Sequence, residues 1–166
     1  MQNFAQYFRA IQTLFFGLLS GQVMVCAVLW FVQNEQTAAP GFQEDRWLQF
    51  TITFSLFLLG VSYFVRKNLI EKARPQETLI AKLRQYRQAI LVGWALIEGA
   101  TLLNAVFFFL SVKIEFLYIA GALIALFITQ IPTKPKLINE LDLNTTDQSV
   151  LDDPNAEVVD APIHKD

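Results

Sequence analysis

The sequence predicts an all-α, polytopic membrane protein, an antiparallel bundle of four transmembrane helices with a helical cytoplasmic hairpin and a disordered acidic C-terminal tail. Composition is the first observation behind this prediction. Apolar residues make up 54% of the 166 residues, and Phe alone occurs 15 times, which is more apolar than an ordinary soluble domain. The second observation is that the apolar residues gather in runs of about 20, the length that a helix needs to cross a bilayer.

Four apolar runs give the predicted helices. The runs, none of which holds more than one charged residue, are 14–32, 47–65, 89–112 and 116–131. With their flanks, they predict helices over about 11–33, 47–71, 75–112 and 114–131. The alternative is a soluble bundle of buried helices, but helices of that kind carry a charged or polar face. The near absence of charge therefore favours lipid as the surrounding solvent.

The first run has a second interpretation as a cleavable signal peptide, because Thr37, Ala38 and Ala39 resemble a small-residue cleavage site. Its 19 residues exceed the roughly 7–15 of a signal h-region, and only Arg9 precedes it. We therefore interpret the run as a retained helix. Cys26, the single cysteine, lies inside it, so the sequence predicts neither a disulfide framework nor a metal cluster.

Basic residues are segregated along the chain, and this predicts an orientation. Of 13 lysines and arginines, all but Arg46 and Lys113 lie at the N-terminus, in the connection 66–87 or in the tail. Because cytoplasmic loops carry the excess of Lys and Arg, we expect both termini and the middle connection to be cytoplasmic. The short external loops and their sparse charge fit a bacterial inner membrane.

The middle connection is predicted to be a helical hairpin. Its sequence is rich in helix formers and is broken once, at Arg74-Pro75, and proline is tolerated in the first turn of a helix. Its basic side chains fit an ordinary loop that follows the positive-inside rule. The alternative is that they contact a partner protein or anionic lipid headgroups, with Lys82, Arg84 and Arg87 as the candidates.

The composition changes after the fourth run, which separates a transmembrane domain, 1–133, from a tail, 134–166. From Pro132 onward the chain has eight acidic and three basic residues. Too little apolar surface is present to offset the entropy of ordering, so we expect the tail to be disordered. A partner protein is expected to bind the tail or the hairpin.

Glu98 is the only charged residue within the third run. An acidic group at mid-bilayer costs roughly 3 kcal/mol on insertion scales, and desolvation favours its protonated form. Such a group needs polar partners or a cavity. The residues of the predicted ion- or proton-binding site are Glu98, Thr101, Asn104 and Gln22. The competing interpretation is a carboxyl that holds two helices together through a hydrogen bond.

Small residues at four-residue spacing occur in three of the predicted helices. Pairs of this kind let two helix backbones approach closely. They predict that the four helices pack on one another through Gly17 and Gly21, Ala95 and Gly99, and Gly121 and Ala125.

Residues 84–103, RQYRQAILVGWALIEGATLL, resemble the carboxylate-bearing helix of the rotor-ring c subunit of rotary ATP synthases. The matching motif is Gly93-Trp94-Ala95-Leu96-Ile97-Glu98, and the resemblance extends over about 66–111. It implies that Glu98 corresponds to the ion-binding carboxylate of that family, and Arg74, Pro75 and Gln76 to its polar cytoplasmic loop.

The sequence contains no HExxH, Walker glycine loop, Gly-x-Ser-x-Gly or CxxC motif. We therefore expect neither an enzyme nor a cofactor, metal or nucleic-acid site. The preferred hypothesis is a small, non-enzymatic structural or accessory component of a membrane complex. The alternative is a proton- or cation-translocating subunit that uses Glu98.

Overall fold

The computed structural model describes residues 4–33, 38–39, 41–42 and 44–152, so Thr37 of the possible cleavage site lies outside it. The described residues form six helices and no strand, which confirms the all-α prediction. The helices are α1 (Phe4–Gln33), α2 (Asp45–Ala73), α3 (Leu79–Ser111), α4 (Ile114–Ile128), α5 (Lys134–Leu141) and α6 (Thr145–Asp152).

Three of these helices are long and apolar enough to cross a membrane. They are α1, α2 and α3, with 30, 29 and 33 residues. At 1.5 Å per residue, α3 is about 50 Å long, well beyond the ~30 Å hydrocarbon core. The fourth predicted span corresponds to α4, which is as apolar but has only 15 residues.

The chain divides into two compact units, and α1, α2 and α3 contribute residues to both. The charged unit comprises Met1–Phe15, Phe64–Val92 and Ile131–Asp166. The apolar unit comprises Phe16–Tyr63 and Gly93–Gln130.

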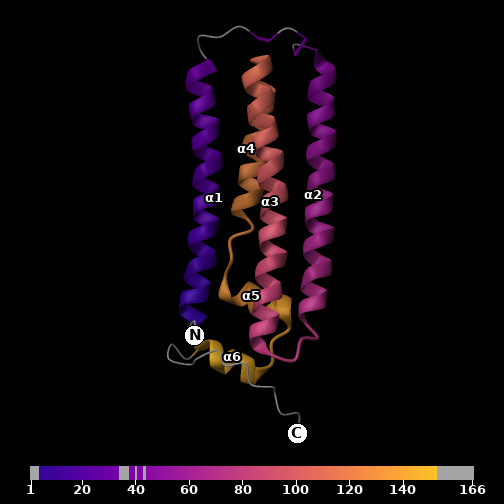
Figure 1. Cartoon of the computed structure of the whole chain (residues 1–166). Coiled ribbons are helices and arrows are strands. Elements are labelled where there is room, and N and C mark those ends of the chain that lie inside the picture. Colours follow the sequence, from indigo (N-terminus) through magenta and orange to yellow (C-terminus); the bar gives the residue numbers. More distant parts are fainter. Residues whose placement is uncertain (1–3, 34–37, 40, 43, 153–166) are drawn as a thin grey trace. The chain divides into compact units, whose positions relative to one another are not determined.

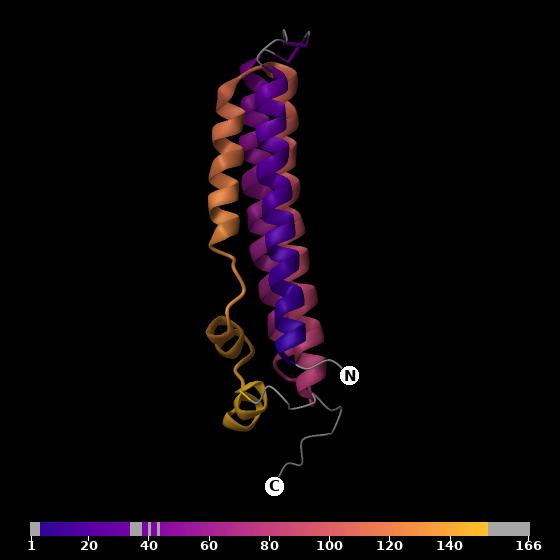
Figure 2. The same ribbon diagram turned by 90° about the vertical axis from the view of Figure 1, so that its left-hand side faces the viewer.

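In the apolar unit, α3 lies between α1 and α2, and α4 packs on one face of the layer that these three helices form (Figures 1 and 2). Trp94 and Phe107 of α3 contact Phe127 and Phe116 of α4, with ring centroids 6.1 and 5.6 Å apart. Half of the most apolar window of α3 is buried, against 17% in α1 and in α2. The helix that carries Glu98 is therefore the central one.

The outer helices of the apolar unit reverse the pattern of a soluble protein. Every buried residue that α1 and α2 contribute to this unit is polar, namely Gln22, Gln33, Thr51, Ser55 and Ser62. Their exposed faces carry large apolar side chains such as Met24, Phe31 and Phe57. Water would penalise this exposure and lipid would not, whereas polar groups in lipid must face other helices. The arrangement supports integration into a membrane.

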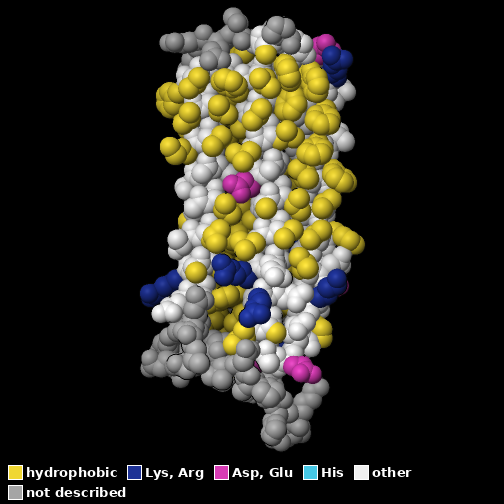
Figure 3. Space-filling view, in the orientation of Figure 1, with side chains coloured by type: hydrophobic (Ala, Val, Ile, Leu, Met, Phe, Trp, Pro, Cys, Tyr) yellow, Lys and Arg dark blue, Asp and Glu magenta, His cyan; other side chains and the backbone are white. Residues whose placement is uncertain are grey.

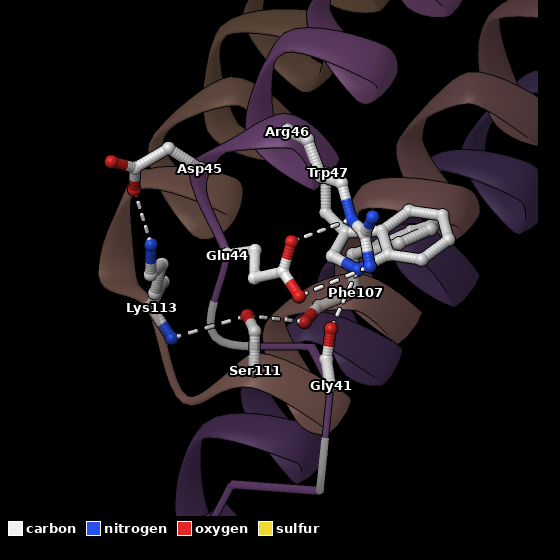
Figure 4. A network of polar contacts seen from close by, with 8 residues as sticks. All are labelled: Gly41, Glu44, Asp45, Arg46, Trp47, Phe107, Ser111 and Lys113. Carbon is white, nitrogen blue, oxygen red and sulfur yellow. Dashed lines mark hydrogen bonds and ion pairs between the residues drawn. The ribbon is translucent and has the colours of Figure 1, made fainter.

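The link between α3 and α4 is short, as predicted for the external loops, because only Val112 and Lys113 separate the two helices. Val112 has a φ of 62°, an unfavourable conformation for a β-branched residue, and its N–H donates to the Phe108 carbonyl at 2.9 Å. Lys113 donates through Nζ to Asp45 Oδ1 at 2.6 Å and through its backbone N–H to Ser111 Oγ at 3.3 Å (Figure 4). These contacts join the start of α2 to the turn and place charges at this end of the unit.

The third helix begins later than predicted, at Leu79 rather than Pro75. Thr78 precedes it, and its Oγ1 accepts a hydrogen bond from the Ala81 N–H at 3.2 Å. A threonine that satisfies a free N–H of the first turn is a favoured N-cap. Arg74 and Pro75 form the turn between α2 and α3 instead of the first helical turn.

The prediction of disorder from Lys134 onward was wrong for residues 134–152, which form α5 and α6, while 153–166 lie outside the described residues. Leu137, Leu141 and Leu151 are buried in the charged unit. Acidic residues of the tail are also neutralised, because Glu140 and Asp147 pair with Arg66 and Lys82. The overlooked signal is the spacing of the leucines, which gives α5 one apolar face.

Candidate functional site

Glu98 lies at the edge between the buried and the exposed face of α3. Trp94 and Thr101, on one side of it, are buried, whereas Ala95 and Gly99, on the other side, are exposed. The Glu98 side chain is itself partly exposed, and none of the described residues forms an ion pair or hydrogen bond with it. Figure 3 shows that hydrophobic side chains cover much of one face of the molecule and that an acidic side chain lies among them. An unpaired carboxyl therefore borders an apolar exterior.

Asn104, also on α3, links that helix to α2. It is fully buried, and its Nδ2 donates at 2.8 Å both to Ser55 Oγ and to the Ala100 carbonyl. About two turns farther along α2, Ser62 Oγ donates to the Gly93 carbonyl of α3 at 2.9 Å. Asn104 thus forms a hydrogen bond across helices to a serine of α2 and not to Glu98.

The other two predicted site residues are buried as well, but they make no cross-helix bond. Thr101 Oγ1 donates to the Ile97 carbonyl of its own helix at 3.0 Å. Gln22 of α1 is completely buried, and neither atom of its carboxamide has a hydrogen-bond partner among the residues that the structure describes. The structure therefore brings all three polar residues into the interior of the apolar unit while leaving Glu98 at its surface.

The six small residues predicted to pack helices are all exposed. At Gly17, Gly21, Gly99 and Gly121, an added Cβ would meet no atom of the described residues within 4 Å. Contrary to the expectation, these positions do not pack the helices of this chain on one another, because large side chains, chiefly aromatic ones, fill the contacts between them. Contact with another molecule is the role that remains open to them.

The three basic residues predicted to contact a partner or lipid differ in their exposure within the charged unit. Lys82 is buried, and its Nζ lies 3.2 Å from Asp147 Oδ2. Arg84 and Arg87 are exposed. The sequence did not predict that Asp147 and Glu140 form ion pairs with basic residues of the hairpin, because the composition of the tail predicts disorder. Glu140 accepts hydrogen bonds from Arg66 Nη2 at 2.6 and 2.9 Å, and partial burial together with the nearby Arg66 lowers the pKa of Lys136.

Comparison of the chain with protein-family models, curated proteins and solved structures found no match. The local resemblance to the rotor-ring c subunit remains a prediction. The proposed function therefore rests on the positions of Glu98 and of the buried polar residues. Among the described residues no group of three or more His, Cys, Asp or Glu side chains is arranged to hold a metal ion.

Proposed function

We propose that this chain is a non-enzymatic structural or accessory component of a membrane complex, with four transmembrane helices and both termini in the cytoplasm. The spans would be α1 to α4, and an even number of spans places both termini on one side. That side is the one with eleven of the 13 basic residues, as the positive-inside rule requires. The short link between α3 and α4 and the few external charges fit a bacterial inner membrane.

The unpaired position of Glu98 carries this proposal. A carboxyl that faces lipid costs roughly 3 kcal/mol unless another group accepts or donates a hydrogen bond. No described residue of this chain does so, whereas Ala95 and Gly99 leave open space beside it. Small residues let a second helix approach closely. A transmembrane helix of a partner would therefore dock on this part of α3 and pair with the Glu98 carboxyl.

A photo-crosslinking amino acid at Ala95 tests the docking in native membranes. We expect one discrete adduct, and we expect Glu98→Leu to reduce its yield because the polar anchor is lost. The matched control is the same probe at Phe57, which is 62% exposed on α2. Absence of an adduct at Ala95, or the same set of adducts from Phe57, would contradict the proposal. An adduct with the mass of two copies would identify the chain itself as the partner.

The basic side chains offer a second contact. Arg84 and Arg87 are exposed and form no ion pair within the described part of the chain. They suit anionic lipid headgroups or an acidic partner at the cytoplasmic surface.

Proton or cation translocation through Glu98 is the alternative function. It is favoured by the polar residues Gln22, Thr101 and Asn104, which are buried in the same unit as Glu98. In reconstituted vesicles, Glu98→Gln should abolish ion flux, while Glu115→Gln, at the exposed start of α4, should leave it unchanged. An ion flux that Glu98→Gln does not change would rule out translocation through Glu98, and it would be consistent with the accessory role.

A further inference from the structure

Five buried polar atoms of the apolar unit have no hydrogen-bond partner in the described part of the chain, and Gln22, Gln33 and Asn104 contribute them. Gln33 is the last residue of α1, whereas Gln22 and Asn104 lie well inside their helices. Both Gln22 and Asn104 are 0% exposed. Gln22 leaves both Oε1 and Nε2 unpaired, and Asn104 leaves Oδ1 unpaired. More than about 90% of buried polar groups in proteins are hydrogen-bonded, and an unpaired one costs roughly 1–3 kcal/mol. This concentration in one interior points to a ligand.

The side chains of Gln22 and Asn104 lie at neighbouring levels of the unit. Trp30 of α1 stacks on Phe108 of α3, with ring centroids 6.1 Å apart, and the two helices run in the same direction (Figure 1). Gln22 and Ala100 lie the same eight residues before Trp30 and Phe108. Because all α-helices rise equally, Gln22 is roughly level with Ala100, and Asn104 lies about one turn, or 6 Å, farther along.

The free atoms define what a ligand must offer. Both N–H groups of Asn104 are already used, by Ser55 Oγ and the Ala100 carbonyl, so its Oδ1 is fixed as an acceptor. Gln22 requires a donor for Oε1 and an acceptor for Nε2. A cation would satisfy only the oxygens, and an anion only Nε2. A small neutral molecule that both donates and accepts satisfies all three atoms.

We infer that the interior of the apolar unit binds water between α1 and α3, held by the carboxamides of Gln22 and Asn104. Buried water typically makes about three hydrogen bonds to groups that would otherwise be unpaired. The inference does not depend on the docking of a partner or on ion transport. If Glu98 does exchange protons, however, bound water near its level would connect it to the polar interior.

Solid-state NMR on proteoliposomes of the labelled full chain tests the inference by magnetisation transfer from water. We expect transfer to the side-chain amides of Gln22 and Asn104, although both are fully buried, on the time scale seen for the exposed Gln49 amide. Gln22→Met, of similar volume, should remove the transfer at Asn104, while Gln49→Met should leave it unchanged.

No transfer to either buried amide, while Gln49 shows it, would overturn the inference. So would a direct contact between the Gln22 and Asn104 amides without water transfer. If Gln22→Met fails to fold, the wild-type spectra alone still decide the question. The crosslinking and flux experiments report on different residues, so their failure is distinguishable from failure here.

Discussion

Replacing Asp147 by alanine is expected to release α6 from the charged unit, at a cost of about 3–5 kcal/mol. Lys82 would lose its only ion-pair partner among the described residues and would stay buried as an unpaired charge, since its Nζ lies 3.2 Å from Asp147 Oδ2. The first turn of α6 would keep its cap, because Asn144 Oδ1 accepts the N–H of residue 147 at 2.6 Å. Hydrogen exchange of residues 143–152 in the purified protein measures this release.

Two controls separate the buried charge from a general loss of contacts. The double variant Lys82→Met/Asp147→Leu removes both charges and should recover most of the protection, because well-packed apolar residues often replace a buried pair at little cost. Lys67→Met removes an exposed charge that lies 4.0 Å from Glu71 and should change little. Unchanged exchange in Asp147→Ala would show that the leucines alone hold α6 in place.

Phe107→Ala is expected to lower the free energy of unfolding of the apolar unit by about 3 kcal/mol. The Phe107 side chain is 8% exposed, and its ring lies 5.6 Å from both Trp47 and Phe116. Lipid supplies little hydrophobic driving force between helices, so their association depends on packing of this kind, which a cavity removes. Thermal unfolding in detergent, followed by circular dichroism, measures the change.

Phe57→Ala is the matched control, because the Phe57 side chain is 62% exposed on the outside of α2. Detergent covers that side chain whether or not the helices are packed, so its loss should lower the melting temperature far less. Equal losses in the two variants would mean that the aromatic residues contribute through general hydrophobicity rather than through the cluster around Phe107.

The helices that the sequence predicted best are those whose signal is local. Runs of apolar residues identified α1 to α4 to within a few residues at most ends, because the hydropathy of one segment decides whether it suits lipid. The start of α3 was missed by four residues, because proline and threonine both signal helix starts and the Thr78 cap prevailed. The helices α5 and α6 were not predicted, because the acidic composition of the tail indicates disorder. The four leucines of the tail are buried only when the charged unit is folded.

For the candidate site too, the sequence identified the residues, whereas the fold determined where they lie. The single carboxyl within the third apolar run marked Glu98 from composition alone, and Gln22, Thr101 and Asn104 stood out as polar residues in apolar surroundings. Their separation into a buried group and a surface carboxyl depends on which face of α3 meets α1, α2 and α4. The exposure of Gly17, Gly21 and Gly99 was equally unforeseen, because the spacing of small residues does not say whether the second helix belongs to the same chain.

The sequence by itself determined the class of this protein and the position of its one acidic residue within the central apolar helix, because the cost of charge in hydrocarbon depends only on the residue and its neighbours along the chain. Only the tertiary structure decided that the outer helices turn their polar residues inward, that Lys82 pairs with Asp147, and that Glu98 has no partner among the described residues. These outcomes depend on contacts between residues far apart in the sequence, and such contacts form only when the helices pack.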